Sequence, residues 1–302
     1  MFTEDQQKYN LMILKIDSSM TLKSLLKTTL QISENSLLKL KKNKKVTINN
    51  EAINFGAVLK KGDVVKIYLS EQASDFEPQN LDLEVVYEDY DVLIINKNAF
   101  YVVHPTKSHK SNTIANGVTY YLESKNESIH VRFINRLDMN TSGLVIVAKN
   151  TFSHQQIGLD MKNELVIKKY IAVVHGVVKN EMGLIDEPIY RDTKTSIKSI
   201  IDEKGLPSQT KYQVVSRLKN ATVLELELLT GRTHQIRLHL AHIGHGIIGD
   251  ELYGYPDASL IHRQALHAYL LEFKQPRTKK NIKVTTVIPD DMEKLIKKLE
   301  VE

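Results

Sequence analysis

A polar turn followed at once by an apolar run constrains the fold more than any other segment of this 302-residue sequence. The turn, residues 135–142, contains the basic side chain of Arg136 and the acidic side chain of Asp138, with Asn, Thr and Ser residues that often bond to their own backbone. The run after Gly143, Leu-Val-Ile-Val-Ala, predicts an interior strand. We therefore expect Asp138 to be presented at the start of a core strand, although a purely structural charged turn would have the same pattern.

Beyond residue 82, apolar alternation and turn signals predict more strands than helices. The expected strands are 83–88, 92–96, 144–148, 166–175, 210–217, 222–229, 266–273 and 283–287. The expected helices are 111–123, 151–162, 233–243 and 289–299. This succession predicts an α+β fold, in which helices pack on a mixed, largely antiparallel sheet.

The first 70 residues differ from the rest, because every basic side chain in them is a lysine. Leucines at helical spacing predict a helix over 21–30, and Ser33 is a suitable N-cap for a second helix. Three strands are expected, at 11–16, 46–48 and 64–69. The pattern indicates a small α/β unit that is separate from the larger sheet.

A polar, acidic stretch without periodicity separates the two parts at about residues 71–80. We therefore expect a first domain over 1–72, a linker over 73–81 and a second domain over 82–302. The total length is sufficient for one large or two unequal domains, each with its own core.

Composition excludes several kinds of chemistry. The chain contains no cysteine, so it has no disulfide, no thiolate metal site and no thiol nucleophile, as is usual in a reducing cytoplasm. The polar amino terminus and the absence of a long apolar run predict neither a signal peptide nor a membrane span. A formal net charge of +5 suits a polyanionic partner. We expect a cytoplasmic monomer that does not bind membranes.

Two motifs suggest cofactors that we do not expect. The segment 244–249 reads G-x-G-x-x-G, but a helix is expected before it and a turn after it, which is the reverse of a dinucleotide site. His239, His242 and His245 are three residues apart and lack the glutamate of a zinc helix motif. The sequence therefore predicts no metal and no cofactor.

Three blocks of sequence resemble the signatures of one enzyme family. The first is Arg-Leu-Asp with Thr-Ser-Gly-Leu over 136–144, the second is Lys-Lys-Tyr-Ile-Ala-Val-Val over 168–174, and the third is Thr-Gly-Arg-Thr-His-Gln-Ile-Arg-Leu-His-Leu-Ala over 230–241. In this order they are similar to the motifs of the RluA-like RNA pseudouridine synthases. The chain departs from that pattern at Asn135, where the family usually has histidine.

The resemblance implies roles for individual residues. Asp138 matches the catalytic aspartate, and Arg232 matches the arginine that pairs with it. Arg136 matches the residue that flips the target base and fills the gap, and Tyr170 matches the tyrosine that lies against that base. We also expect Arg237 to contact RNA.

The amino-terminal pattern of two helices and a small hairpin, with Lys-Gly-Asp at 61–63, resembles the S4 RNA-binding domain. Four clustered lysines are then candidates for phosphate contacts: Lys41, Lys42, Lys44 and Lys45. The alternative is that this lysine run is only a solvated face.

Together these features predict an isomerase that converts uridine to pseudouridine in RNA. Such a reaction rejoins the same base to the sugar through carbon, so it consumes no cofactor. We expect ribosomal RNA ahead of transfer RNA as the partner. Two other functions remain open: an RNA-binding protein with an inactive synthase domain, and a carboxylate-dependent N-glycosidase.

Overall fold

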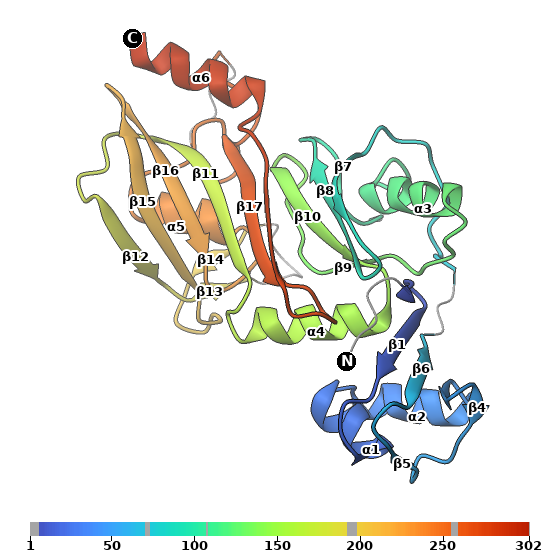
Figure 1. The fold of residues 1–302 in the computed structure, drawn as a ribbon. Helices are drawn as coiled ribbons and strands as arrows, with labels where there is room; N and C mark the ends of the chain where they lie inside the picture. Colours follow the sequence, from blue (N-terminus) through green and yellow to red (C-terminus); the bar gives the residue numbers. More distant parts are fainter. Residues whose placement is uncertain (1–5, 70–72, 107, 192–197, 255–258, 302) are drawn as a thin grey trace.

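The computed structural model describes residues 6–69, 73–106, 108–191, 198–254 and 259–301 (Figure 1). A small amino-terminal unit lies beside a larger unit built on an extended sheet. The end of the predicted first domain, residues 70–72, lies outside the described residues. Among the helices that the structure describes, none has the length and apolar character needed to cross a bilayer.

The amino-terminal unit is a four-stranded antiparallel sheet in the order β1-β6-β3-β4, with helices packed against it. Its elements are β1 (Leu11–Lys15), β2 (Met20–Thr21), α1 (Leu22–Ser24), the π-helical η2 (Leu25–Thr29), α2 (Glu34–Lys42), β3 (Val46–Ile48), β4 (Glu51–Ala52), β5 (Val58–Leu59) and β6 (Val64–Tyr68). As predicted, Ser33 caps α2, where its hydroxyl accepts a hydrogen bond from the Ser36 amide at 3.3 Å. The predicted helix over 21–30 is present as α1 and η2 in succession.

The larger unit is built on a ten-stranded sheet whose main path is β12-β15-β16-β11-β17-β10-β8-β7. β18 pairs with β17 and β9 with β10 beside this path, while β13 and β14 form a separate two-stranded sheet. The strands of the unit are β7 (Glu84–Glu88), β8 (Val92–Lys97), β9 (Arg132–Phe133), β10 (Ser142–Ala148), β11 (Ile167–His175), β12 (Met182–Asp186), β13 (Ile189–Tyr190), β14 (Ile200–Ile201), β15 (Gln209–Arg217), β16 (Ala221–Leu228), β17 (Leu266–Lys274) and β18 (Asn281–Thr285). Its helices are α3 (Ile114–Ser124), α4 (Thr151–Lys162), α5 (Gln235–His242) and α6 (Asp290–Val301). Of the described strand pairs, β10 with β17 is parallel and the others are antiparallel. The predicted mixed, largely antiparallel α+β fold is confirmed.

Strand β10 is buried over all seven residues, which explains its unbroken apolar sequence. Ile146 faces one core together with Ile157 of α4, while Val147 faces a second core together with Val118 of α3. Alternate residues of a strand point to opposite faces, so β10 needs apolar side chains at every position. The strand is therefore anchored on both faces, and it fixes the end of the turn that precedes it.

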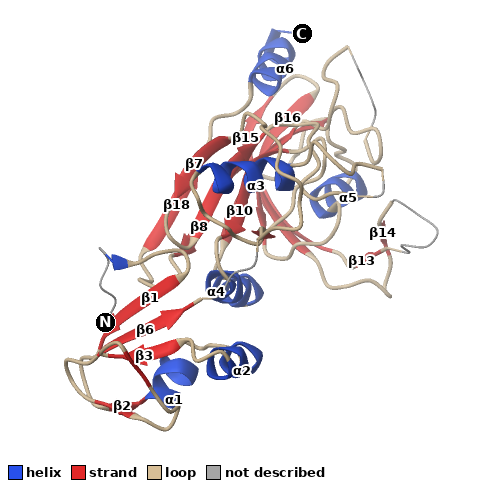
Figure 2. Ribbon diagram, turned by 90° about the vertical axis from the view of Figure 1, so that its right-hand side faces the viewer, coloured by secondary structure: helices blue, strands red, loops and turns tan. Residues whose placement is uncertain are grey.

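The two units are in direct contact through α4, which Figure 2 shows between them. Phe152 belongs to the core of the amino-terminal unit, and the Gln156 side chain donates to the Leu30 carbonyl at 3.2 Å. A second contact is made by the fully buried Arg277, which pairs with Asp91 at 3.0 Å and donates to the carbonyl groups of Lys8 and Leu11.

The predicted linker packs on the larger unit. The Asn116 side chain of α3 donates to the Glu77 carbonyl at 2.8 Å, and Phe76 packs against the core on that side of the sheet. These contacts hold Phe76 and Glu77 of the predicted linker against α3 and its side of the sheet.

Gly143, at the start of β10, gives a direct test of how the turn is held. Its φ is +116°, and a Cβ atom there would lie 2.2 Å from the Ala268 carbonyl oxygen of β17. We expect Gly143→Ala to lower the free energy of unfolding by at least about 1–3 kcal/mol, because the clash is with backbone. Denaturant unfolding of the purified variant measures this loss.

Gly158 is a matched control, since a Cβ atom there would meet nothing within 4 Å on helix α4. Gly158→Ala should raise the free energy of unfolding by about 0.5–1 kcal/mol, because alanine favours the helix. Wild-type stability in Gly143→Ala would show that β10 and β17 do not meet as described.

Candidate active site

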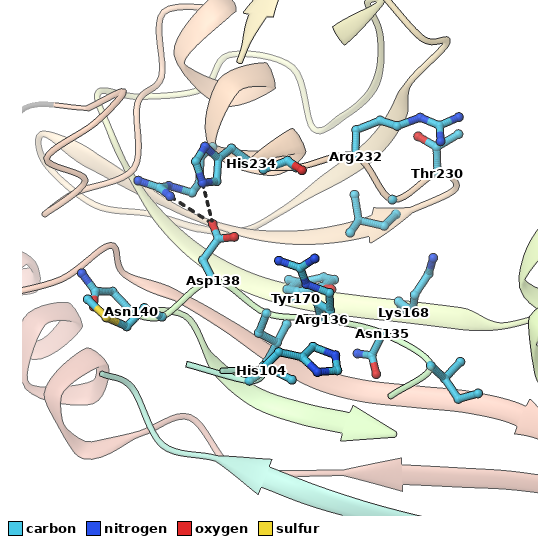
Figure 3. Close-up of a pocket in the computed structure, with 18 of the residues that line it drawn as sticks. His104, Asn135, Arg136, Asp138, Asn140, Lys168, Tyr170, Thr230, Arg232 and His234 are labelled. Atoms are coloured by element: carbon cyan, nitrogen blue, oxygen red, sulfur yellow. Dashed lines mark hydrogen bonds and ion pairs between the residues drawn. The ribbon is translucent and has the colours of Figure 1, made fainter. Parts of the chain in front are cut away.

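A cavity of about 1130 Å³ opens between the turn before β10, strand β11 and the loop that leads into α5 (Figure 3). Five residues singled out in the sequence line it: Arg136, Asp138, Tyr170, Arg232 and Arg237. The cavity is larger than the roughly 300–1,000 Å³ of most small-molecule pockets. The fold therefore brings together residues that lie up to about a hundred positions apart in the sequence.

Two buried side chains, Lys97 and Gln264, bind the turn that carries Asp138. Lys97 donates to the Met139 carbonyl at 3.0 Å, and Gln264 donates to the Thr141 hydroxyl at 3.0 Å. These bonds fix the backbone on both sides of the carboxylate, whose side chain remains 29% exposed. Asp138 is thus fixed at its base and open at its tip.

A guanidinium pairs with Asp138, and it belongs to Arg237. Nη1 of Arg237 lies 3.0 Å from Oδ2 of Asp138, while Nε and Nη2 each lie 2.7 Å from an oxygen of Asp250. Asp250 is fully buried and also accepts hydrogen bonds from the amides of Leu252 and Tyr253. Burial alone would raise the pKa of Asp250, but the Arg237 guanidinium holds that pKa below its usual value.

The predicted pairing of Arg232 with Asp138 is wrong. Nε and Nη2 of Arg232 both lie 3.4 Å from the Pro207 carbonyl oxygen, in an exposed position on the cavity wall. The cause is that α5 begins between the two arginines of the motif, so Arg237 lies in the first turn of the helix and Arg232 in the loop before it. The RNA contact predicted for Arg237 does not fit this geometry, because its guanidinium is shared by two carboxylates.

His234 lies next to the same carboxylate, and the sequence did not assign it to the site. Its Nε2 is 3.9 Å from Oδ2 of Asp138, and its Nδ1 is 3.1 Å from the Tyr253 hydroxyl. Burial lowers the pKa of His234, although the Asp138 charge opposes this. His234 adopts a left-handed conformation, with φ of 59°, just before α5. That backbone turn could not be read from the spacing of apolar residues.

Tyr170 forms part of the cavity wall and part of the core. It is 6% exposed and packs among the apolar residues of β11, β16 and β17. Burial raises the pKa of the Tyr170 hydroxyl, and the Asp138 charge raises it further. The ring is therefore held rigidly, and its phenol stays protonated at neutral pH.

Arg136 and Asn135 differ in their surroundings, although they are adjacent. Arg136 is exposed at the cavity and has no hydrogen bond or ion pair with the described residues. Asn135 donates to the Leu144 carbonyl at 3.1 Å and accepts from the Ile146 amide at 2.8 Å. The Asn135 amide thus bonds to the edge of β10 as a neighbouring strand would, and supports the turn.

The four lysines predicted to contact phosphate lie at the end of α2 and in the turn that follows it. Lys41, Lys42 and Lys44 are exposed and Lys45 is half-buried. They do not line the cavity. Their side chains therefore face solvent on the amino-terminal unit, away from the cavity that contains Asp138.

Fold and site together define a class of enzyme in which a carboxylate, oriented by a buried guanidinium, faces a cavity beside an aromatic ring. The family model for RNA pseudouridylate synthase matches residues 91–242, and the model for the RluD ribosomal pseudouridine synthase N-terminal domain matches residues 9–65.

Individual proteins are similar over most of the chain. An RNA pseudouridine synthase of Bacillus subtilis, YlyB, is 37% identical over 85% of this chain and 86% of its own. The ribosomal large subunit pseudouridine synthase D of Buchnera aphidicola is 38% identical over 74% and 75% of the two chains. The structure of human RNA pseudouridylate synthase domain containing 1 covers 75% of this chain and 98% of its own, with a TM-score of 0.58 and 25% identity.

The chain therefore belongs to the RNA pseudouridine synthase family. It is an isomerase that acts on RNA, as the sequence predicted.

Exchange of each arginine for lysine tests which one serves Asp138. Arg237→Lys keeps the charge but cannot bind both carboxylates through a planar fork, so we expect kcat to fall by about 10- to 100-fold, from the loss of roughly 1.5–3 kcal/mol. Arg232→Lys is the matched control and should change kcat by less than about threefold. Pseudouridine formation at saturating RNA measures both, and the reverse ranking would restore Arg232 as the partner.

Proposed function

We propose that this protein converts uridines of ribosomal RNA to pseudouridine with Asp138 as its nucleophile. The observation that carries the proposal is the carboxylate of Asp138, bound by Arg237 at 3.0 Å and still partly exposed to the cavity. The choice of ribosomal RNA rests on the similarity to ribosomal large subunit pseudouridine synthase D. We further propose that the protein acts as a monomer in the cytoplasm.

The reaction breaks the bond between nitrogen of the uracil and the sugar, and forms a bond between carbon of the same base and the same sugar. An ionised carboxylate can attack either the base or the sugar and be released when the new bond has formed. Arg237 favours the ionised form of Asp138 and fixes its direction. The partly enclosed cavity limits competition by water, which would otherwise release the base.

A uridine inside a stacked RNA must leave the stack before Asp138 can reach it, at a cost of a few kcal/mol. Arg136 is suited to fill the gap, because its exposed guanidinium has no partner among the described residues. Tyr170 provides a rigid ring against which the everted base can lie, worth about 1–3 kcal/mol. Since burial raises the pKa of its hydroxyl, Tyr170 is poorly suited to remove a proton from the base.

We propose that the chain is divided into an S4-like RNA-binding domain (1–72), a linker (73–81) and a catalytic domain (82–302). The exposed lysines at the end of α2, Lys41, Lys42 and Lys44, with the adjacent Lys45, would contact phosphates of the RNA. In this arrangement the amino-terminal domain contributes affinity for RNA, and the catalytic domain carries out the isomerisation.

Replacing Asp138 by asparagine is the principal test. Asp138→Asn preserves size but removes the nucleophile, so we expect pseudouridine to become undetectable while RNA affinity stays within about twofold. Ribosomal RNA from cells that lack this protein is incubated with each form, and pseudouridine and free uracil are both measured. Turnover by Asp138→Asn would contradict the assignment. Free uracil from the wild type would indicate an N-glycosidase, and neither product would indicate a binding protein.

Tyr170 is tested by removal of its hydroxyl and of its ring in turn. Tyr170→Phe should retain kcat within about tenfold, because the stacking face remains. Tyr170→Ala should lose the stacking energy of about 1–3 kcal/mol and far more of the activity. Single-turnover rates at saturating RNA measure both. Equal loss in both variants would instead assign proton transfer to the hydroxyl, and full activity in both would make Tyr170 a core residue only.

A further inference from the structure

Lys168 is a buried ammonium group on the wall of the cavity, and neither the reaction nor the fold uses it. It lies on β11 two residues before Tyr170, so both side chains point to the same face of the strand. Figure 3 shows Lys168 beside Tyr170, projecting toward the side of the cavity where Arg232 lies. Lys168 is only 7% exposed, and it forms no hydrogen bond or ion pair with the described residues.

A charge in this position is costly to the free protein. Burial lowers the pKa of Lys168, and the exposed carboxylate of Glu164 opposes this without forming an ion pair. The adjacent Lys169 contrasts with it, since its Nζ lies 2.6 Å from Glu225. Buried charges are normally paired, so Lys168 has the surroundings of a group whose partner arrives with a ligand.

The lining of the cavity indicates the charge of that ligand. Six cationic side chains and two carboxylates line it. Arg237 is already shared by Asp138 and the buried Asp250, which leaves five cations against the carboxylate of Glu164. Besides Arg136, Lys168 and Arg237, the cations are Lys162, Arg191 and Arg232. The excess favours an anion.

We propose that Lys168 binds a backbone phosphate of the RNA next to the everted uridine. This proposal rests on the proposed function, because the proposed function places the everted base against Tyr170. Residues two apart on a strand are separated by about 6.6 Å, a span comparable to that between the base of a nucleotide and its own phosphate. Tyr170 and Lys168 would thus hold the two ends of one nucleotide.

The test is a binding measurement in the Asp138→Asn background, so that it does not depend on turnover. The probes are uridine, uridine 3′,5′-bisphosphate and an oligouridylate. Lys168→Met should weaken binding of the bisphosphate about tenfold and leave binding of uridine unchanged. For the oligouridylate, the slope of log K against log salt should become shallower by about 0.7, as expected for one lost phosphate contact on a single strand.

Lys169→Met is the matched control, because Lys169 is the neighbouring lysine but is paired on the other face of the strand. It should leave the salt slope unchanged. Lys168→Met should also raise the unfolding temperature, since it removes a buried unpaired charge, whereas a merely structural lysine would lower it. Lys168→Arg should recover part of the bisphosphate affinity.

Three outcomes would overturn the proposal: unchanged bisphosphate affinity and salt slope in Lys168→Met, equal losses for uridine and its bisphosphate, or an equal effect of Lys169→Met. Failure of the wild type to form pseudouridine in ribosomal RNA would instead contradict the proposed function. The two failures are therefore measured separately.

Discussion

The active site depends on one guanidinium that is shared by two carboxylates of unequal burial. Asp250 is fully buried and binds Arg237 through two hydrogen bonds of 2.7 Å, which fixes the plane of the guanidinium. Only Nη1 is then directed at Asp138, which is partly exposed. A carboxylate bound through one oxygen keeps the other available for reaction. The buried pair thus fixes the geometry, and the exposed carboxylate retains its reactivity.

The backbone of the turn that carries Asp138 is held by a second buried cation, Lys97. Nζ of Lys97 donates to the carbonyls of Asn98, Tyr101 and Met139, which accounts for all three of its hydrogen-bond donors. Burial, together with the neighbouring Arg263, lowers the pKa of Lys97 to about 7, while Asp138 opposes the shift. Carbonyl oxygens stabilise such a charge without competing for Asp138 as a carboxylate would. The turn is therefore fixed without neutralising Asp138, the proposed nucleophile.

The sequence predicted those parts of the molecule that have strong local periodicity. The run after Gly143 predicted β10, and the helix expected over 233–243 is present as α5. The side chains of the run and of Ile236 and Leu240 in the helix are buried. Strand β12 was missed because four of its five residues are exposed or half-buried at the edge of the sheet. The parallel pairing of β10 with β17 had no local signal, because strands distant in sequence form it.

The sequence motifs predicted which segments form the candidate site, but not which arginine contacts Asp138. The motifs located Arg136, Asp138 and Tyr170 at one cavity. The choice between Arg232 and Arg237 failed because both belong to one short motif, and only the left-handed turn at His234 decides which of them faces Asp138. Burial of an unpaired Lys168 was likewise invisible in a sequence where Lys168 and Lys169 read alike.

Helix α4 packs against both units and also reaches the wall of the active-site cavity. Its first turns bind the amino-terminal unit through Phe152 and Gln156, while Ile157 packs on the sheet that carries β10. Its last turn supplies Met161 and Lys162 to the wall of the cavity. RNA held by the amino-terminal unit would therefore be positioned relative to Asp138 by α4, together with the contact of Arg277, rather than by a free linker. On the proposed function, contacts remote from the cavity would thereby help to determine which uridine enters it.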